Sequence, residues 1–436
     1  MQKVKVIGGG LAGAECAYFL AQHGVKVDLF DIKPNKFTPA HTSTQYAELV
    51  CSNSLKSNDI YGNAAGLLKQ EMRLLGSIVI EAGDNTKVPA GNALAVDRVK
   101  FADYITKKLK ENKNITHHSE EVVDINVDEY TIVASGPLTT PTFSENLKKL
   151  VGDGLSFFDA SAPVVDFESI DMTSAFFGDR WDKGNGDHIN CPMNKEEYLA
   201  FMDALTTAKR AELHGFENTE VFEGCMPIEV MATRGLDTLR FGPLKPAGLT
   251  DPKTGRWPYA CLQLRKEDEF GSMYNLIGFQ TNLLWGEQKK VFSIIPALKN
   301  AEYLRYGVMH RNTFINSPKL LNSDYSLKGH EKVFFAGQIT GVEGYVESAG
   351  SGLMAGIYCL KKIKGEDFNT ICDKTVLGSL ARYITTENSD FQPMNANFGI
   401  LPQLDRIIKD KSQRKKQMAI RSLQCVEEFK KEMNIW

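Results

Sequence analysis

The sequence of 436 residues has no CxxC pair, no internal repeat, no low-complexity segment and no apolar run long enough to span a membrane. No membrane helix is therefore expected. The first residues are typical of a strand rather than of a secretory leader peptide, so we expect a cytoplasmic protein. The eight cysteines are scattered, which in a reducing compartment indicates thiols rather than disulfides or a zinc site. No metal is expected.

An excess of positive charge is also absent. Lys and Arg number 51 against 54 Asp and Glu, a formal net charge of −3, so no general field attracts a polyanion and any nucleic-acid contact must be local. The strongest basic stretch, residues 405–416, holds six Lys or Arg against two Asp. Two interpretations stay open for it: an exposed amphipathic helix that keeps the protein soluble, or a footprint for RNA phosphates.

The first thirty residues predict a strand, a glycine turn, a helix and a second strand that ends on Asp31. This is the context in which Gly8, Gly10 and Gly13 form a dinucleotide-binding fingerprint. Gly8 permits the tight turn, Gly10 lets a pyrophosphate approach the backbone, and Gly13 lets the helix pack closely. Amides of the first helical turn would face the phosphates, and the Asp31 carboxylate would accept bonds from ribose hydroxyls. A purely structural glycine turn is the alternative.

A buried-type strand at 332–337 enters a glycine-rich segment, 338–352, ahead of an apolar helix. FAD-dependent enzymes of the two-dinucleotide type return to their first domain with such a late strand. We therefore expect an α/β protein with a discontinuous Rossmann-like FAD-binding domain, residues 1–164 and 316–436, and an inserted α+β domain, residues 165–315. The glycine-rich segment would contact the flavin or its phosphates, or it would simply cap a helix with flexible glycines.

Two of the cysteines, Cys51 and Cys225, lie in polar or glycine-bearing loop sequence and are the candidates for reactive thiols. Three other cysteines lie in helical patterns beside apolar residues and are expected to be core thiols: Cys16, Cys359 and Cys425. Cys191, which precedes a proline, and Cys261, in a strand-like run, are expected to be structural. A flavin disulfide reductase would need cysteines paired in sequence, so that class is disfavoured.

Several motifs together resemble one family. They include GGGLAGAE (8–15), ELVCSNSLKSN (48–58), FEGCMPIEVMATRG (222–235), GFQTNLLWGEQK (278–289) and FFAGQITGVEGYVESAGSG (334–352). Across almost the whole chain the sequence is similar to the TrmFO family, the GidA-related, folate- and FAD-dependent RNA (uracil-5-)-methyltransferases. Asp31 stands where the family pattern leads us to expect Glu, which keeps the carboxylate.

The resemblance implies a reaction. Uracil C5 is a poor nucleophile, so a thiolate must first add to C6. The resemblance implies that Cys225 supplies this thiolate and that Cys51 removes the C5 proton or protects the intermediate. The spacing of the two cysteines does not settle which of them takes which role. The carbon would come from 5,10-methylenetetrahydrofolate, the electrons from reduced FAD, and NAD(P)H would reload the flavin. The expected cofactor-binding residues are Gly8, Gly10, Gly13, Asp31, Gly337, Gly341, Tyr345, Trp285 and His310.

The implied partner is RNA, with the T-loop uridine in the T-arm of tRNA as first expectation and a uridine of 23S rRNA as alternative. A GidA-like flavoprotein that modifies the tRNA wobble uridine is another alternative, although such chains are typically longer and carry a C-terminal partner-binding domain. A non-enzymatic FAD-binding scaffold is the last, favoured if the Cys51 and Cys225 loops are buried and inert. The oligomeric state and the choice between NADH and NADPH stay open.

Overall fold

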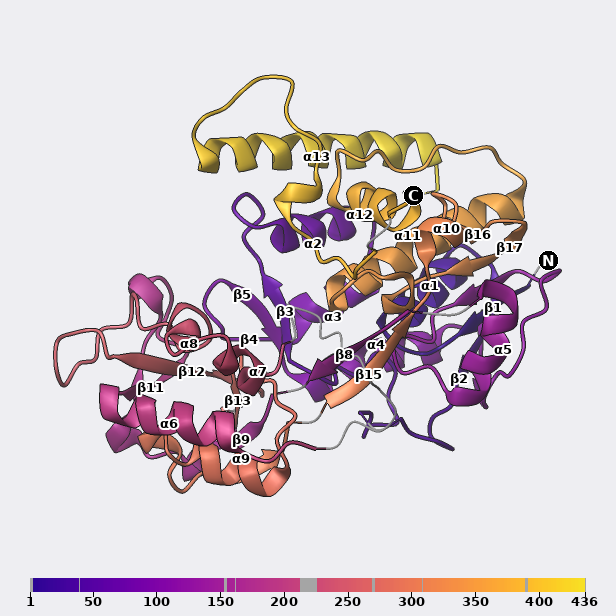
Figure 1. Ribbon diagram of the computed structural model, residues 1–436. Coiled ribbons are helices and arrows are strands. Elements are labelled where there is room, and N and C mark those ends of the chain that lie inside the picture. Colours follow the sequence, from indigo (N-terminus) through magenta and orange to yellow (C-terminus); the bar gives the residue numbers. More distant parts are fainter. Residues whose placement is uncertain are drawn as a thin grey trace.

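The computed structural model describes two units built around separate sheets (Figure 1). None of the helices within the described residues has the length and apolar character needed to cross a membrane. The described residues are 3–38, 40–152, 155–160, 162–211, 226–268, 271–307, 309–388 and 391–435, with the backbone alone for 155–160 and 310–313.

The first unit is built on a six-stranded sheet in the order β16-β17-β7-β1-β2-β6. β1 pairs in parallel with β2 and β7, β2 pairs in parallel with β6, and only β16 runs antiparallel to its neighbour. The predicted late strand is confirmed, because β17 pairs in parallel with β7 through Val333 and Thr131. The strand bounds are β1 Lys3–Ile7, β2 Lys26–Asp31, β6 Ile115–Ser119, β7 Thr131–Val133, β16 Ser326–Leu327 and β17 His330–Phe335.

Two long helices, α1 (Leu11–Gln22) and α11 (Tyr345–Lys364), pack against each other beside this sheet. A Cβ placed on Gly352 of α11 would lie 2.3 Å from the Ala12 carbonyl oxygen, so the close approach needs glycine there. The remaining helices of the unit are α2 Ala64–Leu74, α3 Ile78–Asn85, α4 Arg98–Glu111, α5 Pro141–Val151, α10 Ser317–Leu320, α12 Val376–Thr385 and α13 Lys411–Met433. A small sheet of β3 Ser54–Ser57, β5 Ala93–Val96 and β4 Lys87–Val88 lies on the side of the second unit (Figure 1).

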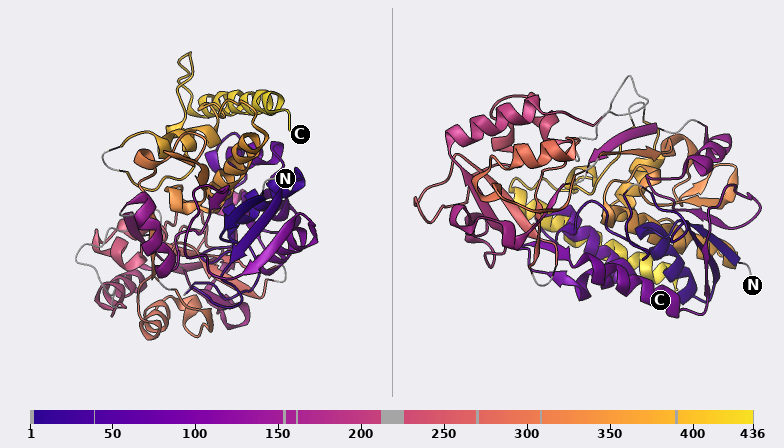
Figure 2. Two further views of the ribbon diagram at one scale, coloured as in Figure 1. Left: turned by 90° about the vertical axis from the view of Figure 1, so that its right-hand side faces the viewer. Right: turned by 90° about the horizontal axis from the view of Figure 1, so that it is seen from below.

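A buried carboxyl group joins three of these helices. Glu71 of α2 accepts hydrogen bonds from the backbone N–H groups of Val376 and Leu377, at 2.8 and 2.9 Å, and from the Ser422 hydroxyl at 2.5 Å. Because these donors open α12 and lie within α13, one side chain holds the C-terminal helices on α2. Figure 2 shows α13 on the outer surface of the first unit.

The second unit has its own antiparallel sheet, in the order β10-β11-β12-β13-β9-β14, and its own apolar core around Phe201, Phe279 and Phe292. It is inserted between β7 and β16 of the first sheet, which confirms the α/β fold class with a discontinuous first unit. The antiparallel pair β8 (Leu155–Ala160) and β15 (Met309–Phe314) runs between the units (Figure 1). The other bounds are β9 Val164–Asp166, β10 Phe176–Phe177, β11 Ile189–Met193, β12 Ala260–Lys266, β13 Met273–Leu276, β14 Tyr303–Arg305, α6 Lys195–Thr207, α7 Ile228–Thr233, α8 Thr238–Phe241 and α9 Trp285–Phe292.

The predicted domain boundaries stay predictions. The boundary between residues 164 and 165 falls inside β9, a strand of the second sheet, and the boundary between 315 and 316 falls just after β15.

Candidate active site

The glycine turn joins β1 to α1 and is shaped by close backbone contacts. Gly8 has φ +108°, and a Cβ there would lie 2.3 Å from the Ala134 carbonyl oxygen. A Cβ on Gly13 would lie 1.8 Å from the Gly8 carbonyl oxygen, so α1 can approach the turn only if residue 13 has no side chain. Gly10 differs, since its φ of −74° suits any residue and no atom lies within 4 Å of a Cβ placed there. The space in front of Gly10 is open.

Asp31 is held at the end of β2 and faces this turn. Its Oδ2 accepts a hydrogen bond from the Gly9 N–H at 3.0 Å and its Oδ1 accepts one from the Lys33 N–H at 2.8 Å. A Cβ on Gly9 would lie 2.4 Å from Asp31 Oδ2, so this position also requires glycine. Gly9 was not predicted as a site residue, although three consecutive glycines were an available signal for it. A carboxylate can accept about four hydrogen bonds, so Asp31 keeps acceptor capacity for a ribose.

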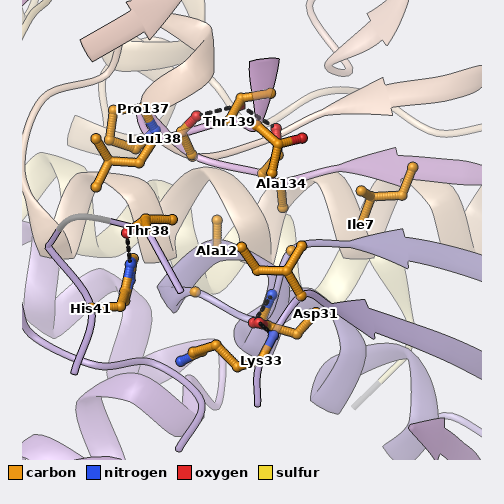
Figure 3. A pocket seen from close by; sticks show the side chains of 18 of the residues that line it. Ile7, Ala12, Asp31, Lys33, Thr38, His41, Ala134, Pro137, Leu138 and Thr139 are labelled. Atoms are coloured by element: carbon orange, nitrogen blue, oxygen red, sulfur yellow. Dashed lines mark hydrogen bonds between the residues drawn. The ribbon is translucent and has the colours of Figure 1, made fainter. Parts of the chain in front are cut away.

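A cleft of about 1160 Å³, open solvent at its mouth included, runs past the glycine turn. Figure 3 shows Asp31 and Lys33 on one side, Ala134, Pro137 and Thr139 on the other, and Ala12 of α1 between them. The first amides of α1 have no partner within the helix and lie at this cleft. An apolar cleft with a few fixed polar groups and a helix N-terminus fits an adenine dinucleotide.

The glycine-rich segment forms another wall of the cleft. Gly337, Gln338, Tyr345 and Ser348 line it. Gly337 has φ +83°, and its N–H donates to the Ser351 hydroxyl at 2.6 Å. The alternative interpretation as a helix cap also describes part of this segment, because Gly344 is the N-cap of α11. Gly341 lies away from the cleft wall, where a Cβ would lie 2.5 Å from the Phe391 ring.

Cys51 lies next to the cleft, in a loop that is hydrogen-bonded to the Tyr345 hydroxyl. The Cys51 and Ser52 N–H groups both donate to the Tyr345 hydroxyl, at 2.6 and 3.0 Å. Val50, the residue before the thiol, lines the cleft together with Tyr345. Burial raises the pKa of Tyr345 well above its usual value, so its hydroxyl stays protonated and neutral. The half-buried Cys51 is thus placed at the edge of the candidate cofactor site.

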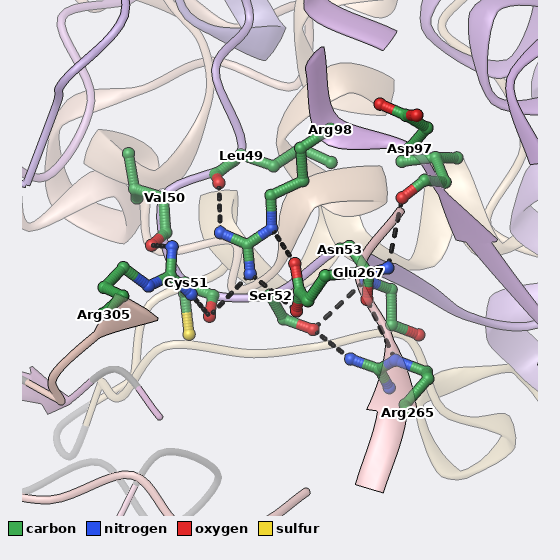
Figure 4. Close-up of polar contacts among 12 residues, drawn as sticks. Leu49, Val50, Cys51, Ser52, Asn53, Asp97, Arg98, Arg265, Glu267 and Arg305 are labelled. Atoms are coloured by element: carbon green, nitrogen blue, oxygen red, sulfur yellow. Dashed lines mark hydrogen bonds and ion pairs between the residues drawn. The ribbon is translucent and has the colours of Figure 1, made fainter. Parts of the chain in front are cut away.

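The second unit contributes polar groups to the same loop (Figure 4). Arg265 of β12 donates through Nε to the Asn53 side-chain oxygen at 2.9 Å and through Nη2 to the Ser52 hydroxyl at 2.7 Å. The amide of Asn53 in turn donates to the carbonyl oxygens of Val96, at 3.1 Å, and Lys266, at 2.6 Å. The Cys51 loop is therefore part of the contact between the two units.

Cys225 lies outside the described residues, as does the side chain of His310 in β15. The chain on either side of Cys225 is anchored to one segment, since the Ala211 N–H donates to the Asn282 carbonyl at 2.8 Å and the Ile228 N–H donates to the Gln280 carbonyl at 2.7 Å. The roles expected for Cys225 and His310 stay predictions.

Trp285 opens α9 and is 61% exposed. Its ring stacks on Tyr306 with centroids 5.4 Å apart, and Tyr306 stacks on Tyr303 at 5.2 Å. It does not line the cleft described above. Its role toward a cofactor stays a prediction.

The cysteines expected to be inert are mostly buried. Cys16, Cys191, Cys261 and Cys359 lie in the core, and burial raises the pKa of Cys261 to about 12. Cys425 is half-buried, and none of the seven described cysteines forms a disulfide. The described part of the chain also shows no cluster of His, Cys, Asp and Glu able to hold a metal ion.

The basic stretch 405–416 enters α13 and is used within the fold. Lys415 donates to the Gly62 carbonyl at 2.8 Å and lies 5.4 Å from the Phe398 ring centroid. Lys416 lies 5.9 Å from the Tyr61 ring centroid. These contacts favour the interpretation as a surface helix, although they leave the lysine charges available to an RNA.

The parallel sheet, the glycine turn, the acidic residue that ends the second strand and the late returning strand define the class of FAD-type dinucleotide-binding proteins. A family model described as GIDA, Glucose inhibited division protein A, matches residues 3–367. The solved structure of Aquifex aeolicus GidA aligns with a TM-score of 0.73 over 100% of this chain and 74% of that chain, at 17% identity, and shows the shared fold.

Closer relatives are found among proteins named "Methylenetetrahydrofolate--tRNA-(uracil-5-)-methyltransferase TrmFO". The protein of Acetivibrio thermocellus is 54% identical over 428 residues, which are 98% of each chain. That of Staphylococcus aureus (strain Newman) is 54% identical over 433 residues, 99% of each chain. The chain belongs to the TrmFO family, and the resemblance seen in the sequence is confirmed.

Proposed function

We propose that this protein methylates C5 of a uridine in RNA, with 5,10-methylenetetrahydrofolate as carbon donor, FAD as redox cofactor and NAD(P)H as the reductant that restores it. The observation that carries the proposal is the Cys51 loop, because Tyr345 both lines the dinucleotide cleft and binds the backbone N–H of Cys51. A reactive-thiol candidate is thereby fixed beside the candidate flavin site. The TrmFO relatives, whose names include tRNA, support tRNA as the substrate, and we propose its T-loop uridine as the target.

The residues of the cleft fit FAD. Gly10 leaves open space where a pyrophosphate can approach, Gly8 and Gly13 close the turn behind it, and Asp31 is oriented to accept ribose hydroxyls. When bound, FAD supplies the electrons that convert the transferred methylene to a methyl group.

The chain's own residues supply the covalent and acid–base chemistry. A thiolate, which we assign to Cys225, adds to C6 of uracil, so that C5 gains the electron density to attack the one-carbon unit. The C5 proton then has to leave before the thiolate is expelled from C6, and we assign its removal, or protection of the adduct, to Cys51. Tyr345 and the arginines around the loop keep the Cys51 backbone in place during these steps.

The test is transfer of label from methylenetetrahydrofolate in the presence of NAD(P)H to separate transcripts of tRNA and 23S rRNA. We expect label in the tRNA alone, lost when the T-loop uridine is replaced by cytidine, and no label from S-adenosylmethionine. Label in the rRNA alone would instead support the ribosomal substrate. Label from S-adenosylmethionine, or none with either RNA, would refute the proposal.

A further inference from the structure

The peptide groups around Cys51 are held by two arginines in addition to Tyr345. Arg98 donates through Nη1 to the Leu49 carbonyl at 2.9 Å and through Nη2 to the Cys51 carbonyl at 3.5 Å. Arg305 donates through Nη1 to the Val50 carbonyl at 3.3 Å and through Nη2 to the Cys51 carbonyl at 3.4 Å. The Cys51 carbonyl therefore lies between two guanidinium groups.

The two arginines come from different units. Arg98 is the first residue of α4 in the first unit, and Arg305 is the last residue of β14 in the second. Arg98 also forms an ion pair with Glu267, the residue after β12, with Nη2 3.0 Å from Oε1. Arg305 is used differently, because the two side-chain hydrogen bonds described for it both end on the Cys51 loop. Its Nε is buried and has no hydrogen-bond partner among the described residues.

The hydrogen bonds described from Arg98 and Arg305 to this loop end on its main-chain carbonyls. Figure 4 shows the Cys51 carbonyl facing Arg98 and Arg305, and the sulfur pointing away from Arg98. Burying a guanidinium is costly unless its donors are satisfied. Because both described hydrogen bonds of the half-buried Arg305 end on this loop, they restrain the position of the loop and of the thiol that it carries.

We propose that Arg305 is a positioning residue that holds the Cys51 thiol at the edge of the dinucleotide cleft, so that the second unit sets the geometry of a thiol carried by the first. The role assigned to Cys51 rests on the proposed function. The position of the loop does not, and it can be measured without RNA or folate.

The experiment compares Arg305→Gln and Arg305→Lys in the flavin-loaded protein. Glutamine removes the charge and the two-pronged donor, whereas lysine keeps the charge but offers a single ammonium group. Arg240→Gln is the matched control: Arg240 is another partly buried arginine of the second unit, and it binds the Tyr259 carbonyl and Asp237 instead of the loop.

Amide hydrogen exchange of a peptide that covers residues 49–53 is the first measurement. We expect exchange about tenfold faster in Arg305→Gln, the equivalent of about 1.4 kcal/mol of lost protection, an intermediate rate in Arg305→Lys and no change in Arg240→Gln. Methyl transfer is the second measurement. We expect kcat to fall about tenfold to a hundredfold with little change in KM for RNA, because misplacing a reacting group by about 1 Å costs that much.

Unchanged exchange of the 49–53 amides in Arg305→Gln would overturn the proposal, as would faster exchange with an unaltered kcat. Loss of flavin and of protection throughout the first sheet in both variants would also overturn it, because Arg305 would then act on the fold as a whole. If the wild-type protein transfers no methyl group but the exchange of the loop responds as expected, the proposed function fails and the structural role of Arg305 stands.

Discussion

Replacing Gly10 by alanine separates the requirements of the fold from those of the ligand. The backbone there has φ −74°, and no atom lies within 4 Å of the added Cβ. The apoprotein should therefore tolerate the change, with a free energy of unfolding within about 1 kcal/mol of wild type. The open space in front of Gly10 is where the FAD pyrophosphate is expected, so the methyl group should obstruct it.

The loss of affinity can be estimated from the hydrogen bonds at stake. A hydrogen bond to a charged group contributes about 1.5 to 3 kcal/mol, and each 1.4 kcal/mol is about tenfold in affinity. If the methyl group displaces one amide–phosphate bond, FAD should bind about tenfold to a hundredfold more weakly to Gly10→Ala. The assay is titration of apoprotein with FAD, followed by flavin fluorescence, beside urea unfolding of the same apoprotein.

Two other glycines provide controls. Gly24 has φ +80° with no atom within 4 Å of an added Cβ, so Gly24→Ala should cost about 1 to 2 kcal/mol of stability through backbone strain alone and leave FAD affinity intact. Gly13→Ala would place a Cβ 1.8 Å from the Gly8 carbonyl oxygen, so both folding and FAD binding should fail. Wild-type FAD affinity in Gly10→Ala would refute the placement of the phosphates at the glycine turn.

Three further predictions concern other parts of the chain. Cys225→Ala should abolish methyl transfer and keep the flavin content near normal; loss of both together would indicate a structural cysteine. Changing Arg414, Lys415 and Lys416 to Ala should weaken tRNA binding and flatten the plot of log affinity against log salt by about 0.7 to 0.9 for each phosphate that is no longer bound, whereas unchanged affinity and slope would leave the stretch as a surface helix. Burial raises the pKa of Glu71 to about 7, so the folded state favours the protonated form of this side chain. The free energy of unfolding should therefore fall by up to about 3 kcal/mol as the pH rises from about 4.5 to 7. In urea unfolding at several pH values, Glu71→Gln should make the free energy of unfolding depend less on pH.

The glycine fingerprint could be predicted because its requirements are local. A turn with positive φ at Gly8 and the contact of Gly13 with that turn involve residues only a few positions apart, and the strand, helix and acidic residue around them are visible in the sequence. The late strand was also predictable, since a short apolar run followed by glycines is distinctive. Both features belong to the first unit.

The contacts around Cys51 could not be predicted in this way. The loop was identified from its polar composition, but the arginines that hold its carbonyls lie 47 and 254 positions away along the chain from Cys51. Neither arginine lies in a periodic pattern that indicates its partner. Such a convergence depends on how the second sheet docks on the first, which the hydrophobic pattern of either unit does not specify. Tyr345 was expected near the flavin, whereas its bonds to the Cys51 and Ser52 amides were not expected.

The docking of the two units has a consequence for how the active site is completed. Asn53 is fully buried, and its side chain bonds to Val96 in the first unit and to both Arg265 and Lys266 in the second. Removing the Asn53 amide from the docked protein would leave the Val96 and Lys266 carbonyls and the Arg265 guanidinium without this partner, at a cost of about 1 to 3 kcal/mol for each group that stays buried. The hydrogen bonds of the loop around Cys51 are therefore complete only when the inserted unit is seated, although the sequence of the loop belongs to the first unit. The place of the second unit in the chain is consistent with these contacts. The inserted segment places β12 and β14 against the loop that carries the thiol, and the chain then returns to the first sheet.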